Sequence, residues 1–304
     1  MTERRFGRYR VGLTNLDKVY FPEAGLTKGD LIAYYDDVAD LVLRGLRDRP
    51  LSLQRYPDGL GGEGFYQKRV SSHAPSWLRT LEVRSEGKPL EQPVASNRAS
   101  LIYLAGQGTI SFHPWLSRAD AIDYPDQLVI DLDPSTDDFE PVRRAAFRLR
   151  DLLEEIGLAG YARLTGSRGV HVVTPLNRSS PFDEVRPFAR DVARALVDRG
   201  EDLTVEVRKA KRGNRVFVDW LRNAYAQTTV ASYSVRARAT APVVTPVSWE
   251  ELEDPAIGPQ SYDLGNIRER LDRVGDPWRG MARHARSIGR PRERLAALLE
   301  PSRV

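Results

Sequence analysis

The chain contains 304 residues, with 46 Lys and Arg against 42 Asp and Glu, so its formal net charge is only +4. This length allows one or two domains with a full core, and a hydrophobic content of 41% is typical of a globular protein rather than a disordered one. The sequence has no apolar run of membrane-spanning length and no cysteine, which excludes disulfides, zinc–thiolate sites, iron–sulfur clusters and a cysteine nucleophile. We therefore expect a cytoplasmic protein whose metal chemistry uses oxygen and imidazole ligands.

The hydrophobic pattern alternates between helical and strand-like periods along the chain. Thr27 and Asp30 have the spacing of a capping box, so a helix is expected to begin at Thr27 and to continue through Val42. Gln127–Asp133 is the clearest strand, because it is rich in β-branched residues and Pro134 closes it. Further helices are expected over 97–107, about 141–156, about 183–197 and in the last forty residues, and further strands over 51–56, 64–70, 109–112, 161–164, 170–174 and 215–220.

The order of these elements lacks the regular period of a doubly wound parallel sheet. We therefore expect an α+β fold with mixed or antiparallel sheets flanked by helices. The sequence contains no internal repeat, low-complexity stretch or long linker. We interpret residues 1–304 as a single catalytic domain that ends in Arg-rich helices over 266–304.

The small net charge hides two segments of opposite sign. Residues 121–140 contain seven acidic residues and no basic one, whereas residues 205–240 contain eight basic and two acidic residues. Local fields of both signs favour a protein that holds cations in one place and polyanions in another. A basic face in contact with solvent is the alternative interpretation of the second segment.

Two carboxylates, Asp131 and Asp133, close the strand over Gln127–Asp133. Side chains two apart in a strand point to the same face, so these groups repel unless a cation lies between them. A third carboxylate, Asp219, ends the apolar run Val-Phe-Val, where its burial is costly unless it is paired or bound to a metal. Three carboxylates suit a two-metal phosphoryl-transfer site with Mg²⁺ or Mn²⁺. The alternative is that Asp133 caps a turn and Asp131 is an ordinary strand end.

The segment Thr165–His171 combines two glycines, two hydroxyls, an Arg and a His. Glycines let backbone N–H groups approach an anion, hydroxyls donate hydrogen bonds, and Arg168 offers bidentate contacts to phosphate oxygens. The segment predicts a phosphate site, with a plain hairpin turn as the alternative. His113, in Phe-His-Pro-Trp, is either a further phosphate or metal ligand or a packed histidine.

Lys18 and Lys28 stand out in a chain with only six lysines. Their compact ammonium groups suit a terminal phosphate. Phe65 and Tyr66, just before Lys68, have the character of residues that stack on a nucleic-acid base. A buried aromatic strand is the alternative interpretation of this pair.

In this order, the motifs resemble the polymerase domain of bacterial ligase D, a member of the archaeo-eukaryotic primase superfamily. The resemblance runs without interruption from about residue 9 to about residue 265. It is carried by Leu13–Val19, Gly25–Lys28, Phe65–Lys68, Phe112–Trp115, Asp131–Pro134, Gly166–His171, Val216–Trp220 and Tyr233–Arg238.

The resemblance implies a primase-like catalytic core and a DNA repair polymerase. Such an enzyme is a nucleotidyltransferase that uses Mn²⁺ or Mg²⁺ and NTP or dNTP substrates. It extends a 3′-hydroxyl at short gaps or broken ends bearing a 5′-phosphate, with a preference for ribonucleotides. The implied partners are gapped or broken duplex DNA, with a separate DNA ligase and Ku in non-homologous end joining. We expect a bacterial, nucleoid-associated monomer that acts as a stand-alone polymerase.

The resemblance also implies a role for each matching position. The expected catalytic residues and metal ligands are Asp131, Asp133 and Asp219. The expected contacts to the incoming nucleotide are His113, Thr165, Ser167, Arg168, His171, Arg212 and Arg236. Lys18 and Lys28 are expected to bind the downstream 5′-phosphate of the DNA, and Phe65 and Tyr66 to contact the template.

Two other functions stay compatible with these residues. A metal-dependent nuclease uses three carboxylates equally well, and it would shorten a nucleic acid rather than extend it. A non-catalytic module that binds DNA ends and recruits a ligase would bind DNA without incorporating nucleotides, and its carboxylates would be dispensable.

Overall fold

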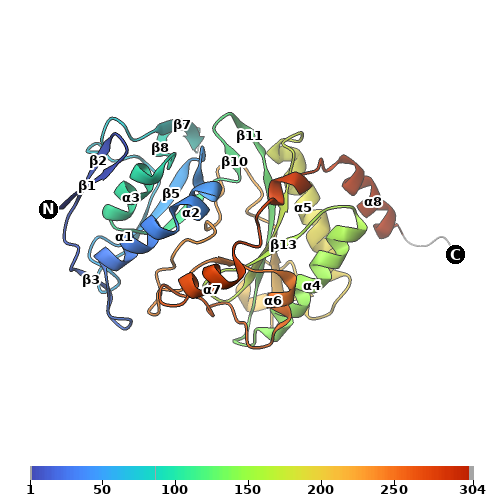
Figure 1. Cartoon of the computed structure of the whole chain (residues 1–304). Helices are drawn as coiled ribbons and strands as arrows, with labels where there is room; N and C mark the ends of the chain where they lie inside the picture. Colours follow the sequence, from blue (N-terminus) through green and yellow to red (C-terminus); the bar gives the residue numbers. More distant parts are fainter. Residues whose placement is uncertain (1, 86, 301–304) are drawn as a thin grey trace. The chain divides into compact units, whose positions relative to one another are not determined.

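The computed structural model describes residues 2–85 and 87–300, and these residues form two compact units (Figure 1). Unit 1 contains the residues up to Asp120 together with 228–244 and 262–275. Unit 2 contains 121–227, 245–261 and the residues from Asp276 onwards. Within the described ranges, no helix combines the length and the apolar character of a membrane span. The single catalytic domain expected from the sequence stays a prediction.

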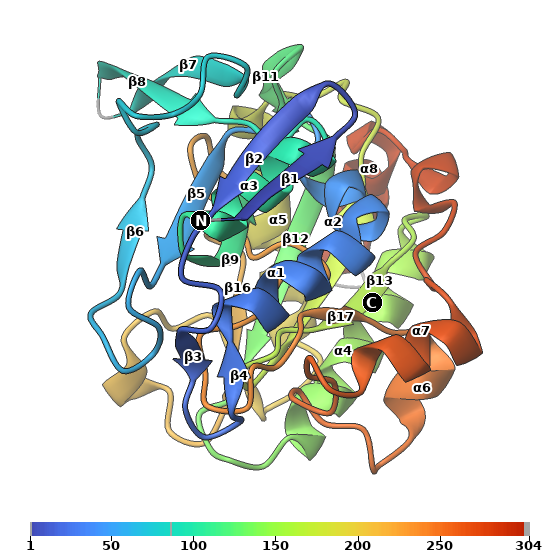
Figure 2. The same ribbon diagram turned by 60° about the vertical axis from the view of Figure 1, so that its left-hand side comes forward.

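Unit 1 combines small antiparallel sheets with helices. Its elements are β1 (Thr2–Phe6), β2 (Tyr9–Leu13), β3 (Val19–Phe21), β4 (Leu26–Thr27), α1 (Lys28–Asp37), α2 (Ala39–Leu46), β5 (Leu51–Arg55), β6 (Phe65–Gln67), β7 (Thr80–Ser85), β8 (Lys88–Pro93), α3 (Arg98–Gly106), β9 (Thr109–Pro114), β10 (Ser117–Arg118) and α7 (Ile267–Val274). β5 is the middle strand of a three-stranded antiparallel sheet with β6 and β9. Figure 2 shows the β3–β4 hairpin at the start of α1.

The first helix begins where the sequence predicts. The Thr27 side chain accepts a hydrogen bond from the Asp30 N–H, and the Asp30 carboxylate accepts one from the Thr27 N–H at 2.7 Å. The continuous helix expected through Val42 is instead divided in two. At Val38 the backbone leaves the α region (φ −98°, ψ 15°), so α1 ends at Asp37 and α2 begins at Ala39. The hairpins β1–β2 and β7–β8 were not predicted.

Unit 2 is organised around a six-stranded sheet. Its elements are β11 (Ala121–Pro125), β12 (Gln127–Asp133), α4 (Glu140–Glu155), β13 (Tyr161–Leu164), β14 (Val170–Pro175), α5 (Phe182–Val197), β15 (Leu203–Thr204), the 3₁₀ helix η1 (Lys209–Lys211), β16 (Val216–Asp219), β17 (Thr245–Pro246), α6 (Trp249–Glu253), η2 (Met281–His284) and α8 (Gly289–Leu299). The strand order is β15-β16-β12-β14-β13-β17, and every neighbouring pair is antiparallel except β15–β16. The expected α+β fold with mixed sheets is therefore confirmed.

The core of unit 2 lies between this sheet and two amphipathic helices. α4 and α5 both pack against β12 and also contact each other, so they cover the same face of the sheet. Every residue of β14 is buried, and Leu128, Ile130 and Leu132 of β12 are fully buried. This packing fixes the two central strands and leaves Asp131, Asp133 and His171 on the opposite side.

A buried asparagine, Asn223, holds the chain that follows β16 against β12. Its side-chain amide donates to the carbonyl groups of Val129 (2.6 Å) and Trp220 (2.8 Å), and its oxygen accepts from the Val129 N–H (2.8 Å). The ladder between β12 and β16 stops at the pair Asp131 and Asp219. Asn223 therefore satisfies the backbone of Val129 where β16 no longer does.

We predict that Asn223→Ala lowers the free energy of unfolding by about 2–4 kcal/mol, because buried backbone groups lose their partners. Ser248→Ala serves as a reference in the same unit: the Ser248 side chain accepts from the Glu251 N–H and caps α6, and its loss costs about 1 kcal/mol. Urea denaturation followed by circular dichroism measures both. An Asn223→Ala loss no larger than that of Ser248→Ala would contradict the role given to Asn223.

Candidate active site

β12 places two carboxylates at the end of a buried strand. Ile130 and Leu132 are fully buried, while Asp131 and Asp133 remain partly accessible on the other face. Because side chains alternate along a strand, the two carboxylates share that face. This is the arrangement that the sequence predicted.

Antiparallel pairing aligns four polar residues across the sheet. β16 pairs with β12 so that Asp219 lies directly opposite Asp131. On the other side of β12, His171 of β14 lies opposite Asp131, and Arg163 of β13 lies opposite His171. Residues that lie directly opposite each other face the same side of a sheet. The polar row Asp219–Asp131–His171–Arg163 therefore crosses four strands, with Asp133 beside it.

Three members of the polar row are in direct contact. Nε2 of His171 lies 3.3 Å from Oδ2 of Asp131. Nε and Nη2 of Arg163 lie 3.1 Å and 2.9 Å from Nδ1 of the same imidazole. Arg163 is only 3% exposed and was not among the predicted site residues. A signal was present in the sequence, because an Arg within the strand Tyr-Ala-Arg-Leu is costly to bury without a partner.

The pKa values of the three carboxyl groups are shifted in opposite directions. Burial raises the pKa of Asp131, but the contact with His171, together with the charges of Arg222 and Arg163, outweighs burial and holds that pKa below its ordinary value. Burial and the charge of Asp131 raise the pKa of Asp133 to about 6. Burial also raises the pKa of Asp219, despite a hydrogen bond from the Leu221 N–H. For Asp133 and Asp219, the charges of nearby arginines are not sufficient to offset burial.

The three carboxylates fit a hard divalent cation. Oδ1 of Asp131 is buried and has no hydrogen-bond partner among the described residues, so its lone pairs are available to a ligand. Across the described ranges, no three Asp, Glu or His side chains converge to enclose a metal ion by themselves. Mg²⁺ is usually held by one or two carboxylates together with water and substrate phosphates, so a closed cage is not required. Asp131, Asp133 and Asp219 suit such a cation.

The predicted phosphate segment forms the turn between β13 and β14. The Thr165 hydroxyl accepts from the Gly169 N–H (3.2 Å), and the Thr165 N–H donates to the Gly169 carbonyl (3.1 Å). A Cβ atom at position 169 would clash with the carbonyl of Leu132, so only glycine fits against β12 here. The hairpin interpretation is therefore correct for the backbone of this segment. The phosphate contacts of Thr165, Ser167 and Arg168 stay a prediction.

Two arginines place positive charge beside the carboxylates. Both Arg168 and Arg212 lower the pKa of Asp133 against the larger effects of burial and Asp131. The Arg212 guanidinium lies 3.7 Å from the centre of the Phe217 ring, and Phe217 is paired opposite Asp133. Arg212 Nε also donates to the carbonyl of Glu206 at 2.9 Å. Arg222 of the same segment lowers the pKa of Asp131 and of Asp219. The basic segment thus contributes two guanidinium groups that act on the carboxylates, while its members at 208, 209, 211 and 215 are exposed.

Lys18 and Lys28 come together in unit 1. The Lys28 N–H donates to the Lys18 carbonyl at 2.8 Å, and the Lys18 ammonium pairs with Asp58. Burial lowers the pKa of Lys28, and the nearby charges of Lys18 and Arg55 lower it further. The positive charges of Lys18, Lys28 and Arg55 repel one another, and a bound anion would relieve this repulsion. Arg55 is a further candidate residue that the sequence did not indicate.

Phe65 and Tyr66 lie on the surface of unit 1, with 47% and 57% of each residue exposed. The alternative of a buried aromatic strand is therefore wrong. The Tyr66 ring meets the ring of the buried His113 edge-on, at 5.4 Å between centroids. Ser111 lies on β9, the strand that also carries His113, and its hydroxyl donates a 2.5 Å hydrogen bond to the carbonyl of Val235. Arg236 is the next residue after Val235. Stacking and nucleotide contacts of these residues stay predictions.

Comparison with known proteins identifies the family. A family model described as "LigD, primase-polymerase domain" matches residues 27–278, which is more than half of the chain. The chain belongs to this family. The resemblance expected from the motifs is confirmed, and so is the class of enzyme, a nucleotidyltransferase of the primase-polymerase type.

Curated relatives are larger proteins of the same family. The chain is 35% identical over 275 residues to the multifunctional non-homologous end joining protein LigD of Pseudomonas aeruginosa, covering 88% of the chain and 32% of the relative. It is 34% identical over 277 residues to the corresponding protein of Mycobacterium bovis, covering 88% and 36%. A bifunctional LigD of Bacillus subtilis is 29% identical over 272 residues, covering 88% and 44%. The chain therefore spans less than half the length of these relatives.

A solved structure supports the fold. The polymerase domain from Mycobacterium tuberculosis ligase D, determined in complex with DNA, matches with a TM-score of 0.85 and 32% sequence identity. The match covers 91% of this chain and 99% of that domain. The likeness thus extends over nearly the whole of both chains, well beyond the separate motifs.

The raised pKa of Asp133 predicts a specific effect of pH on the metal-free protein. The folded-state value of about 6 exceeds the ordinary 3.8, so ionisation opposes folding, and stability falls as pH rises from about 4 to about 6. We predict that Asp133→Asn raises the free energy of unfolding by about 1–2 kcal/mol at pH 7.5 and leaves it unchanged at pH 4.

The control for Asp133→Asn is Asp137→Asn, which makes the same change of net charge at an exposed position. Thermal unfolding in the presence of a chelator at both pH values measures the effect. An equal shift for the two variants, or no shift for Asp133→Asn at pH 7.5, would show that Asp133 is not under electrostatic strain.

Proposed function

We propose that the chain is a metal-dependent DNA repair polymerase. It adds nucleotides, with a preference for ribonucleotides, to a 3′-hydroxyl at short gaps or broken ends that bear a 5′-phosphate. The observation that carries this proposal is the pairing of Asp131 with Asp219 across β12 and β16, with Asp133 on the same face. This carboxylate group occurs in a chain of the LigD primase-polymerase family.

Asp131, Asp133 and Asp219 would hold Mn²⁺ or Mg²⁺. When bound, such cations stabilise the attacking and leaving oxygens of an in-line phosphoryl transfer. The chain's own contribution is to hold the carboxylates at the end of a rigid buried strand. In Asp131, one oxygen is occupied by His171 and the other has no hydrogen-bond partner among the described residues, so the carboxylate is oriented before any ligand arrives.

The proposed contacts to the incoming triphosphate are polar side chains. They are Thr165, Ser167, Arg168 and Arg212, and both arginines act electrostatically on Asp133. The two ring nitrogens of His171 face Arg163 and Asp131, so the contribution proposed for His171 is made through Asp131. His113 and Arg236 are proposed as further nucleotide contacts because the motifs that carry the family resemblance imply this role. Guanidinium groups favour phosphate because they offer paired donors in one plane.

The DNA contacts would come from unit 1. The cluster of Lys18, Lys28 and Arg55 suits the dianionic 5′-phosphate at the downstream side of a gap, because like charges already gathered there are relieved by an anion. The exposed rings of Phe65 and Tyr66 suit stacking on template bases. The solved relative in the comparison contains DNA, which supports a nucleic-acid substrate.

The relatives are named for non-homologous end joining, which supports broken duplex DNA as the substrate in the cell. We propose that a separate DNA ligase seals the products and that Ku presents the ends. We propose a monomer as the active form.

We predict that Asp131→Asn lowers nucleotide addition on a one-nucleotide gap with a 5′-phosphate by on the order of 10³-fold, because metal ligation contributes several kcal/mol to the transition state. The assay supplies rNTPs or dNTPs with Mn²⁺ or Mg²⁺ and separates products on a sequencing gel. Asp137→Asn is the control, since this carboxylate is exposed and lies outside the site.

The same gel separates the competing functions. Shortening of the labelled strand by the wild-type protein would indicate a nuclease. Binding of the gapped duplex without any product, unchanged by Asp131→Asn, would indicate a non-catalytic DNA-end-binding module. Full extension by Asp131→Asn would exclude the proposed metal site.

We predict that Lys18→Ala/Lys28→Ala removes the preference for a 5′-phosphorylated gap over an unphosphorylated one and leaves extension of a simple primer–template largely unchanged. The physical reason is the loss of two of the three cations gathered in unit 1. Rates on the three substrates measure the effect, with the exposed Lys88→Ala as the control. Equal losses on all three substrates would argue against a 5′-phosphate site.

A further inference from the structure

We propose that Arg163 is a positioning residue for the metal site: it fixes the proton of His171 on Nε2, so that His171 holds one oxygen of Asp131 and leaves the other for the metal. The inference rests on the proposed function, because it takes Asp131 as a metal ligand. It adds a residue of β13 that has no place among the predicted ligands or nucleotide contacts.

The geometry begins with the side of the imidazole that faces Arg163. Both Nε and Nη2 of the guanidinium lie within hydrogen-bond distance of Nδ1, at 3.1 Å and 2.9 Å. A guanidinium carries only donors and stays protonated in proteins. Nδ1 of His171 must therefore be the acceptor, which means that it carries no proton.

The second ring nitrogen follows from the first. A neutral imidazole with an unprotonated Nδ1 carries its proton on Nε2. Nε2 faces Oδ2 of Asp131 at 3.3 Å, so this N–H donates to the carboxylate. The chain of donation runs from Arg163 through His171 to Asp131. With the opposite tautomer, two lone-pair atoms would face each other at Asp131 and two N–H groups would face each other at Arg163.

The consequence appears at the other carboxylate oxygen. Oδ1 of Asp131 is buried and has no hydrogen-bond partner among the residues described. A buried oxygen without a partner is costly unless a ligand supplies one. Because Oδ2 is held by His171, rotation of the carboxylate is restricted and Oδ1 keeps one direction. This is the role that groups behind a metal ligand play in orienting it.

Arg163 is itself held in place by its surroundings. It is 3% exposed, and its guanidinium lies 5.7 Å from the centre of the Trp278 ring. Trp278 Nε1 donates to the carbonyl of Ala162 at 3.1 Å, which anchors the indole to β13. A buried guanidinium with these contacts has little freedom to leave Nδ1.

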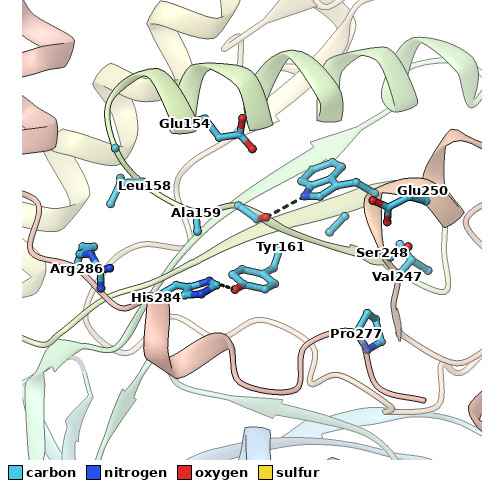
Figure 3. Close-up of a pocket in the computed structure, with 14 residues that line it drawn as sticks. Glu154, Leu158, Ala159, Tyr161, Val247, Ser248, Glu250, Pro277, His284 and Arg286 are labelled. Carbon is cyan, nitrogen blue, oxygen red and sulfur yellow. Dashed lines mark hydrogen bonds between the residues drawn. The ribbon is translucent and has the colours of Figure 1, made fainter. Parts of the chain in front are cut away.

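Tyr161, two residues before Arg163 on β13, provides a matched control. Figure 3 shows its hydroxyl directed at His284, in a pocket of about 490 Å³ in unit 2. The hydroxyl oxygen lies 2.5 Å from Nδ1 of His284, and the Tyr161 ring meets Trp278 edge-on. Tyr161→Phe therefore removes a hydrogen bond to a different histidine, His284. Tyr161 lies on the same strand as Arg163 and contacts the same aromatic side chain, Trp278.

The direct test is long-range ¹H–¹⁵N NMR of the metal-free full chain with ¹⁵N-labelled histidine. His171 is assigned by comparison with His171→Gln. We expect the wild-type ring to show an unprotonated Nδ1 and a protonated Nε2. In Arg163→Met the Nδ1-protonated form should appear, whereas Tyr161→Phe should change the signals of His284 and leave those of His171. A wild-type ring protonated on Nδ1, or on both nitrogens, overturns the proposal without any variant.

The second readout is the affinity for Mn²⁺ alone, measured by calorimetric titration. We expect Arg163→Met to weaken Mn²⁺ binding by about 10–100-fold. Arg163→Lys should recover part of the loss, because its ammonium group also has only donors and can donate to Nδ1, and Tyr161→Phe should match the wild type. An unchanged tautomer together with unchanged Mn²⁺ affinity in Arg163→Met overturns the proposal. Asp131→Asn separates the two hypotheses: if it retains Mn²⁺ binding, the metal site itself is wrong, whatever Arg163 does.

Discussion

Repulsion between carboxylates is the constraint on which the site depends. The pairing of β12 with β16 sets Asp131 directly opposite Asp219, and like charges in that position destabilise a sheet. On one side the repulsion is offset by His171, which contacts Asp131 and is itself supported by Arg163. Among the described residues, no histidine makes such a contact with the carboxyl groups of Asp133 and Asp219, and their pKa values are raised. In the proposed function, a divalent cation would relieve the remaining negative charge.

The two units show opposite electrostatic imbalances. Unit 2 gathers carboxylates within an acidic segment, whereas unit 1 gathers Lys18, Lys28 and Arg55, and the pKa of Lys28 is lowered by burial and by its neighbours. One arrangement calls for a cation and the other for an anion. The proposed polymerase, which joins a nucleotide to DNA, needs both. In this proposal, the small net charge of +4 conceals two local sites of opposite charge rather than an even coating of charge.

Local signals in the sequence predicted much of this structure. The capping box at Thr27 and the strand that ends at Asp133 were placed correctly, because each depends on a few adjacent residues. Arg163 and Asn223 were missed, because their roles come from strand pairing and from a loop that returns to β12. Pairing between distant strands cannot be read from local periodicity, so the sequence did not predict the register of the polar row. The break between the two helices at Val38 was also not predicted.

The most direct test of the central claim is an anomalous diffraction map of crystals grown with Mn²⁺, recorded at the manganese absorption edge. The account predicts a peak within coordination distance of Oδ1 of Asp131, with Asp133 or Asp219 as a further ligand and with Oδ2 still in contact with His171. A map with no peak at Asp131, in crystals where Mn²⁺ is bound elsewhere, would contradict it.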